Sequence, residues 1–373
     1  MVKLIFDTVL TGHHLEYIHH IWNGAIERPN DKFVFAVPEK EWNSTILNKE
    51  WTKPDNVALR LLNDEEVAYI RNCNKGLKNW RRSRLAVKIL KEVKANEIIM
   101  IILAIGIPFL PFLLPKKTKL SGIIYKIFLY DTKNKLKFII DYLLYYIIAK
   151  KSNVKAVFML NDSFSSNILN ERFKTNKFIC LPDPVVPMPK QPLLSLRERF
   201  GIKRDNNVFL HFGAMDVRKG TIDILKAILL LEKTDNSVFI FAGKINENIR
   251  NEFYSLYRDI EKIGIRIIVL DEFCSYEMLH NLCHTSDCIL MPYHLTNLSS
   301  GVVGYASLHK IPVIGPSTGL IGRLINEYNL GITLDKINPT RIFEEIKRFK
   351  PYKIDCKYAK KNNVKSFIST ILG

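Results

Sequence analysis

Two segments in the second half of the chain carry residues suited to binding an anion. The first spans residues 213–220, which read Gly-Ala-Met-Asp-Val-Arg-Lys-Gly. Its two cations are adjacent: Arg218 can bind an anion through two nitrogens, and Lys219 supplies a compact positive charge. Positive charges at the start of a helix oppose its dipole, so a bound anion explains them better than helix stability does. We therefore interpret the segment as a phosphate site, with an ordinary basic helix start as the alternative.

The second candidate anion site lies in the loop that follows an apolar run stopped by Pro292. Such a run is typical of a buried parallel strand, and a helix over 302–309 with a serine cap is expected next. The first N–H groups of a helix lack partners within the helix and favour anions. The residues expected to present these groups are Ser299, Ser300, Gly301 and Val302.

The elements that position these loops alternate between short apolar runs and helical patterns. From residue 208 the order strand, loop, helix repeats with few interruptions, which indicates a parallel sheet. Loops that follow neighbouring parallel strands open at one edge, where α/β sheets bind ligands. The chain also begins with a β run, followed by a turn that holds Gly12, His13 and His14. A chain of 373 residues with two such halves predicts two domains.

The glycine loop, the serine loop and the phrase Leu-Pro-Asp-Pro-Val at 181–185 together resemble retaining GT-B glycosyltransferases of family 4 type. That family carries a Glu-x7-Glu pattern at the helix start, before a strand that ends in Pro-Val-Ile. Counting back from Pro312, the glutamate positions fall on Asn297 and Tyr305, so both glutamates are absent. The segment Ser-Ser-Gly-Val-Val-Gly-Tyr-Ala is similar to a subgroup that keeps the loop and helix without the acids.

This resemblance implies an α/β chain with the GT-B fold, in which two Rossmann-like doubly wound domains face a central cleft. The proline-rich stretch after residue 181 has the composition of a stiff linker and sets the boundary. We expect an N-terminal acceptor-side domain at 1–186 and a C-terminal donor-binding domain at 187–354. A helix at about 355–373 can cross back to the first domain, as the last helix often does in GT-B proteins.

The resemblance also implies a function: transfer of a sugar from a nucleotide-sugar donor, with retention of anomeric configuration and without a metal or other cofactor. The cations Arg218 and Lys219 would hold the donor diphosphate, with Gly213 at the turn. Charge grows on that diphosphate as the glycosidic bond breaks, so cations there stabilise the transition state. Phe273 would stack on the nucleobase, and Tyr305 would meet the ribose.

Asn297 and His14 are the candidate catalytic residues. Asn297 could bind a sugar hydroxyl where the family has a glutamate, with less strength than a charged group. On the acceptor side, Gly12, His13 and His14 form the loop that faces the cleft in the resembled family. The acceptor is expected to be a glycan or a lipid-linked glycan in the synthesis of a surface polysaccharide.

Alternative functions can be weighed by the sequence motifs that they require. A catalytically silent GT-B scaffold, or a protein that only binds carbohydrate or nucleotide, is the main alternative because the two glutamates are missing. Residues 1–373 contain no Walker A phosphate loop, no Gly-x-Ser-x-Gly motif, no convincing Asp-x-Asp metal motif and no cysteine pair spaced for a metal. The six cysteines read as small buried residues of a reducing cytosol. Nucleic acid is not expected as a partner, since no nucleic-acid-binding signature accompanies the basic charge.

Positive charge is concentrated in one part of the chain. The formal net charge is +18, and residues 71–160 alone contribute +15, with 19 Lys and Arg against 4 Asp and Glu. A block of this kind predicts an anionic partner such as a lipid surface or a polyphosphate, with a merely solvated surface as the alternative. We expect a cytoplasmic protein, with no signal peptide at its start and an anionic membrane face as a candidate partner.

Residues 98–115 form an uncharged stretch of 18 residues, which is close to membrane-spanning length. Gly106, Pro108 and Pro111 would interrupt a continuous helix. The favoured interpretation is a buried strand over 98–105 followed by an apolar loop. The alternatives are a loop that dips into one leaflet beside Lys116 and Lys117, or a spanning helix.

Overall fold

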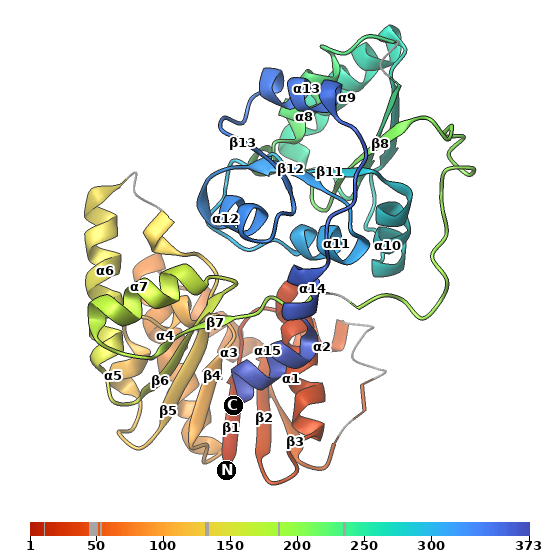
Figure 1. The fold of residues 1–373 in the computed structure, drawn as a ribbon. Helices are drawn as coiled ribbons and strands as arrows, with labels where there is room; N and C mark the ends of the chain where they lie inside the picture. The colour runs from red at the N-terminus through yellow and green to blue at the C-terminus, as the bar shows by residue number, and fades with distance from the viewer. Residues whose placement is uncertain (11, 45–50, 53, 131–133, 186, 234–235) are drawn as a thin grey trace. The chain divides into compact units, whose positions relative to one another are not determined.

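The computed structural model describes residues 1–10, 12–44, 51–52, 54–130, 134–185, 187–233 and 236–373. These residues form two compact units, one made of Met1–Pro182 with Phe367–Gly373 and the other of Asp183–Ser366 (Figure 1). Each unit has its own parallel sheet and its own apolar core. The domain limits expected from the sequence remain predictions.

The first unit contains a seven-stranded parallel sheet in the order β3-β2-β1-β4-β5-β6-β7. The chain runs outward from β1 to β3 and then returns to β4 on the other side of β1. Such a reversal leaves a space at the carboxyl ends of the two central strands, where ligands bind. The strands are β1 (Val2–Phe6), β2 (Lys32–Pro38), β3 (Val57–Leu62), β4 (Glu97–Met100), β5 (Lys119–Ile124), β6 (Val154–Leu160) and β7 (Phe178–Leu181).

Helices cover both faces of this sheet, because alternate strand residues point to opposite sides. Leu4 and Phe6 belong to one core, which they share with α3, α4, α5, α6 and α7, whereas Ile5 belongs to the other, with α1, α2 and α15. The helices are α1 (His13–Ile26), α2 (Glu39–Ser44), α3 (Asp64–Arg71), α4 (Lys75–Glu92), α5 (Leu110–Leu113), α6 (Lys135–Lys150), α7 (Ser163–Phe173) and α15 (Val364–Leu372).

The uncharged stretch at 98–115 lies mostly in the interior of the first unit. Strand β4 ends at Met100, where its pairing with β1 stops, and a 3-10 helix (Leu103–Ile105) and the short α5 follow. The strand expected to reach residue 105 is therefore shorter, because the chain turns into the 3-10 helix, after which the carbonyl of Gly106 accepts a hydrogen bond from Ser83 of α4. Leu103 and Leu110 are buried, as the favoured interpretation expects, whereas Phe112 near the end of the stretch is exposed. No helix in the described ranges is long and apolar enough to cross a membrane.

The second unit contains a six-stranded parallel sheet in the order β10-β9-β8-β11-β12-β13, which again reverses beside its first strand. Helices α8, α9 and α13 pack on one face around Phe209 and Phe239, and α10 contacts α11 (Figure 1). The elements are β8 (Asn207–Phe212), α8 (Thr221–Ile228), β9 (Ser237–Ala242), α9 (Glu247–Ile263), β10 (Arg266–Leu270), α10 (Tyr276–Thr285), β11 (Cys288–Leu290), α11 (Gly301–His309), β12 (Val313–Pro316), α12 (Gly319–Glu327), β13 (Gly331–Leu334), α13 (Pro339–Arg348) and α14 (Lys357–Lys361).

The chain ends in two helices, α14 and α15, where the sequence predicts one helix at about 355–373. Tyr358 of α14 is buried in the second unit, and the chain breaks at Asn362 and Asn363. Asn363 accepts a hydrogen bond from the backbone N–H of Ser366, which suits the start of a new helix. Helix α15 then completes the core of the first unit, where Phe367 stacks on Tyr17 with ring centroids 5.1 Å apart.

Candidate functional site

Three loops meet at the carboxyl edge of the second sheet. Gly220 ends the loop after β8 with a φ of +70°, and a Cβ there would lie 2.2 Å from the carbonyl oxygen of Pro292 after β11. Glycine is therefore the residue that fits without a shift of backbone. The loop after β11 contacts the start of α12 in turn, since the carbonyl of Thr296 accepts hydrogen bonds from the N–H groups of Leu320 and Ile321. The loops after β8, β11 and β12 thus form one continuous surface.

The two predicted cations have different surroundings on this surface. The Nζ of Lys219 lies 3.4 Å from the carbonyl oxygen of Phe212 and 5.4 Å from the ring centre of Tyr293, so it sits over the ends of β8 and β11. The turn itself needs a glycine, because Gly213 has a φ of +92°. Arg218 is more exposed and lies 3.3 Å from the carboxylate of Asp216. Lys219 is therefore the cation held at the sheet edge, whereas Arg218 pairs with a carboxylate of its own loop.

A buried histidine, His211, connects the strands beneath the loop at 213–220 through hydrogen bonds. His211 of β8 contacts the carbonyl oxygen of Leu290 through Nδ1, at 2.8 Å, and the hydroxyl of Thr221 through Nε2, at 3.0 Å. A carbonyl only accepts, so Nδ1 carries the proton and Nε2 accepts from Thr221. Burial lowers the pKa of His211 to about 4, which keeps the ring neutral near pH 7. The imidazole thereby joins β8, β11 and the first residue of α8, and the sequence analysis missed it.

Asn297 presents an unsatisfied acceptor in the loop after β11. The residue is 7% exposed, and its Oδ1 atom has no hydrogen-bond partner among the residues that the structure describes. A buried amide oxygen without a partner costs about 1–3 kcal/mol, so such atoms in native proteins call for a specific reason. A hydroxyl of a bound ligand would satisfy it. Asn297 is one of the two positions where the resembled family has a glutamate.

The start of α11 differs from the expected serine cap. The helix begins at Gly301, and Ser300 stands at the cap position without a side-chain hydrogen bond to the helix. Ser299 instead donates its hydroxyl to the carboxylate of Asp183, at 2.6 Å. The serine cap was therefore a wrong prediction, since Ser299 is engaged by the segment before β8. The N-terminus of α11, with Val302 in its first turn, carries no side-chain cap.

Two further predicted donor residues differ greatly in exposure. Tyr305 of α11 is buried, with its ring 5.4 Å from that of Phe212 and 5.0 Å from that of His280. Phe273 follows β10 and is 90% exposed. An aromatic ring this exposed has an open face for stacking, whereas the Tyr305 ring already packs inside the unit. The contacts of both residues with a ribose or a base remain predictions.

The first unit carries a separate polar cluster at the end of β1. Asp7 is buried and its carboxylate lies 2.7 Å from Nδ1 of His14, while the N–H groups of Thr8 and Val9 donate to its other oxygen. Burial raises the pKa of Asp7, and the bond to His14 opposes that rise. The His14 ring also stacks on Tyr125, with centroids 5.6 Å apart. His14 is thus held in one orientation with Nε2 left for a ligand.

The other predicted residues of this turn are less informative. Gly12 adopts a φ of +60° directly before α1, and a Cβ there would meet no atom within 4 Å. The side chain of His13 lies outside what the structure describes.

Arg82 is a residue of the first unit that the sequence analysis missed. It lies on α4, its Nε atom is buried, and that atom has no hydrogen-bond partner in the described part of the chain. Burial lowers the pKa of Arg82, and the charge of Asp7 opposes the shift. The guanidinium therefore lies within electrostatic reach of the Asp7 and His14 pair. Nothing in the sequence separates Arg82 from Arg81 and Arg84 beside it, because its environment depends on the fold.

The described residues contain no group of three or more His, Cys, Asp or Glu side chains placed to hold a metal ion. The cysteines are free, and burial raises the pKa of Cys283 and Cys288, the two that are fully buried. The groups described above that can bind a ligand are the cations Lys219 and Arg218 and the hydrogen-bonding side chain of Asn297.

Comparison with protein-family models and with curated proteins found no match. Solved structures match over the full chain. HepE from Anabaena, in complex with UDP and glucose, is 14% identical with a TM-score of 0.69, covering 100% of this chain and 98% of its own. A glycosyltransferase from Rickettsia africae is 15% identical with a TM-score of 0.65 and coverage of 100% and 93%. A trehalose-phosphate synthase from Burkholderia vietnamiensis is 8% identical with a TM-score of 0.70 and coverage of 100% and 98%. These likenesses confirm the predicted GT-B fold.

Proposed function

We propose that this chain is a glycosyltransferase that moves a sugar from a nucleotide-sugar to a glycan or a lipid-linked glycan. The observation that carries the proposal is the unsatisfied Oδ1 of Asn297 on the same continuous loop surface as Lys219. Such a surface offers a cation for a diphosphate and an acceptor for a sugar hydroxyl. HepE, a structural neighbour, has been crystallised with UDP and with UDP-glucose, which favours a uridine diphosphate donor.

The proposed reaction depends on charge that grows on the leaving diphosphate. Lys219 and the uncapped N-terminus of α11 would stabilise that charge, and Arg218 would join them by leaving Asp216. Phe273 would stack on the base and Tyr305 would line the ribose side. These groups would replace a divalent cation, so we propose a metal-independent reaction. Retention of configuration rests on the family resemblance.

The acceptor side is proposed to use the cluster at the end of β1. Because Asp7 engages Nδ1 of His14, the Nε2 atom is the one that can accept a proton from an acceptor hydroxyl or orient it. Gly12 and His13 belong to the same turn. WaaG, another structural neighbour, is a glycosyltransferase involved in lipopolysaccharide biosynthesis, and it supports a lipid-linked acceptor. We propose a cytoplasmic enzyme that works at the inner face of the membrane.

Thermal unfolding with nucleotides tests the donor site. UDP, UDP-glucose and matched guanosine and adenosine compounds would be added to the protein in the presence of EDTA. A ligand at a hundred times its dissociation constant adds about 2.7 kcal/mol to the folded state. We expect one diphosphate nucleotide and its sugar form to stabilise the protein without metal. Formation of a glycosylated product from candidate acceptors would then establish turnover.

The second candidate function is a silent GT-B scaffold, favoured by the replacement of both family glutamates by Asn297 and Tyr305. It predicts nucleotide binding without turnover, or no binding at all. Absence of stabilisation by every nucleotide would contradict the transferase and leave the scaffold.

A further inference from the structure

Helix α6 is apolar on both of its faces, and only one of them is covered in this structure. Tyr145, Ile148 and Ala149 pack in the core of the first unit. The opposite side exposes six large apolar side chains, each between 42% and 69% exposed. We name these residues the α6 stripe; they are Leu136, Ile139, Ile140, Leu143, Tyr146 and Ile147. Their spacing of three and four residues places them along one side of the helix.

A stripe of this kind indicates an interaction surface. Helices that are apolar all round are normally buried, and soluble proteins rarely expose large continuous apolar patches without a function. The stripe runs along most of a 16-residue helix, which is about 24 Å long. Helix α5 extends the patch, because Phe112 is 57% exposed and its ring lies 3.7 Å from Nζ of Lys151, just after α6.

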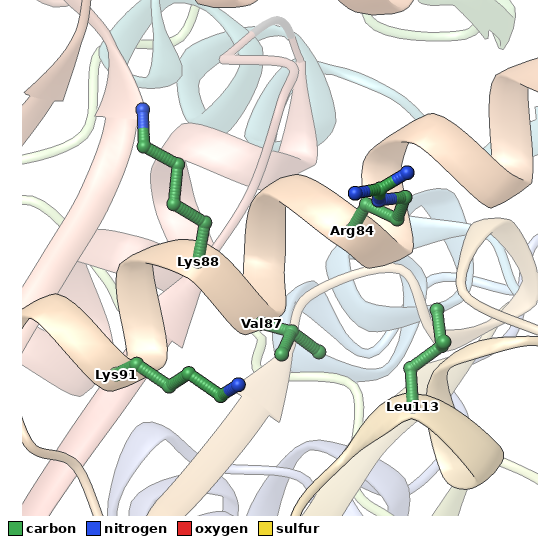
Figure 2. Close-up of a pocket in the computed structure, with 5 residues that line it drawn as sticks. All are labelled: Arg84, Val87, Lys88, Lys91 and Leu113. Carbon is green, nitrogen blue, oxygen red and sulfur yellow. The ribbon is translucent and has the colours of Figure 1, made fainter.

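A basic hollow of about 320 Å³ adjoins this patch on α4 and α5. Arg84, Val87, Lys88 and Lys91 of α4 line the hollow with Leu113 of α5, which follows the exposed Phe112 (Figure 2). Lys88 pairs with Glu66 at 3.2 Å, whereas Arg84 and Lys91 form no ion pair with a described residue. Both cations are therefore available to an anionic group. The hollow is large enough for a phosphate and lies on the helix layer that also contains α6.

Lysines lie at both ends of the apolar stripe, and Asp141 is the acidic residue of the helix. Lys135 and Lys137 lie at the start of α6, and Lys150 and Lys151 lie at its end. A second copy of the chain docked on this face would bring these like charges toward one another. An anionic bilayer would instead pair them with lipid phosphates, while the apolar side chains enter the boundary of the acyl chains.

We propose that the α6 stripe, Phe112 and the basic hollow form one docking face for an anionic lipid bilayer, with Arg84 and Lys91 on lipid phosphates. The helix lies on the membrane and does not cross it, in keeping with the absence of a spanning helix in the described ranges. This inference rests on the membrane-facing part of the proposed function. Donor binding in the second unit does not depend on it.

Co-sedimentation with vesicles tests the proposal. We expect the protein to bind phosphatidylcholine vesicles that contain about a third phosphatidylglycerol, and to bind pure phosphatidylcholine far more weakly. The double variant I140E/L143E should lower the affinity about 100-fold, because it places two charges in the apolar stripe. The double variant R84A/K91A should lower it about 25-fold, which is about fivefold for each cation.

Matched controls lie in the second unit. Leu194 is 61% exposed and Lys262 pairs with Asp259, so L194E and K262A should bind vesicles as the parent protein does. Thermal unfolding followed by circular dichroism should give the same midpoint for every variant and the parent, which shows that the variants are folded. Unchanged vesicle binding by I140E/L143E, or no binding by the parent protein, would overturn the proposal without touching the transferase. A dimer in analytical ultracentrifugation that L143E dissociates, with no vesicle binding, would assign the face to a second copy.

Discussion

At the scale of single residues, Lys219 and Arg218 are expected to contribute unequally to donor binding. Lys219 is already held over the strand ends, whereas Arg218 must leave Asp216 before it can reach a diphosphate. Lys219→Ala should weaken UDP binding about 30-fold and Arg218→Ala about fivefold, and the double variant should weaken it about 150-fold. Isothermal titration measures each value. Lys226→Ala on α8 serves as the control, and equal affinity of the Lys219 variant and the parent would remove the diphosphate assignment.

Asn297 allows stability and turnover to be separated. Asn297→Ala removes a buried oxygen that accepts no hydrogen bond from a described residue, so the variant should raise the free energy of unfolding of the ligand-free protein by about 1–3 kcal/mol. Turnover should fall about 100-fold, since the proposed contact with a sugar hydroxyl is lost in the transition state. UDP affinity should stay nearly constant. Equal turnover of variant and parent would place the sugar elsewhere.

His211 gives stability a defined pH dependence. Its pKa is about 4 in the folded protein and near 6.5 in the unfolded chain, so the unfolded chain takes up the proton first as pH falls. Stability from this residue is complete above pH 6.5 and is lost toward pH 4, by about 3 kcal/mol. His211→Asn removes the group that takes up this proton. The free energy of unfolding, measured with urea at several pH values, should therefore change less with pH in the variant than in the parent protein. His309, whose pKa burial also lowers to about 4, should keep part of the slope. If the free energy of unfolding of variant and parent depended on pH in the same way, His211 would be exposed to solvent in the folded protein.

At the scale of elements, the sequence predicts what depends on local pattern. The alternation of apolar runs and helices after residue 208 predicts the second sheet, and the glycine and serine loops lie at its carboxyl edge. Features that depend on distant partners are not visible in the pattern. Ser299 meets Asp183, and the Arg82 side chain is enclosed only once α4 has docked. The exposed side of α6 reads in sequence like a second core face, because only the fold decides which side is covered.

Helix α15 illustrates how much one distant element contributes. Phe367 is fully buried against Tyr17, and Nζ of Lys3 donates to the carbonyl of Leu372, so the last helix closes the core around β1. Phe367→Ala should lower the free energy of unfolding of the first unit by about 3–5 kcal/mol. Leu77→Ala, at a position that is 49% exposed, should cost little. Circular dichroism in urea measures both, and equal stability of the two variants would show that α15 is not part of that core.

At the scale of the whole molecule, the two units carry different chemistry. Residues 71–160, which contribute +15 of the net charge of +18, lie within the first unit, together with the α6 stripe. The residues proposed to bind the donor all lie within the second unit. Hydrogen exchange followed by mass spectrometry should therefore give two separate footprints. UDP should protect the loops at 213–220 and 293–303, and anionic vesicles should slow exchange in α5 and α6.

The two footprints also test whether donor site and membrane face are assigned to the right units. Amides at the start of α11 would be shielded by a diphosphate, whereas amides of α6 are already bonded within the helix and respond only if docking suppresses its opening. Variant R84A/K91A should lose the vesicle footprint and keep the UDP footprint, and the Lys219→Ala and Arg218→Ala pair should do the reverse. Protection by UDP confined to the first unit would contradict the donor assignment. Protection of the α11 loop by vesicles would contradict the docking face.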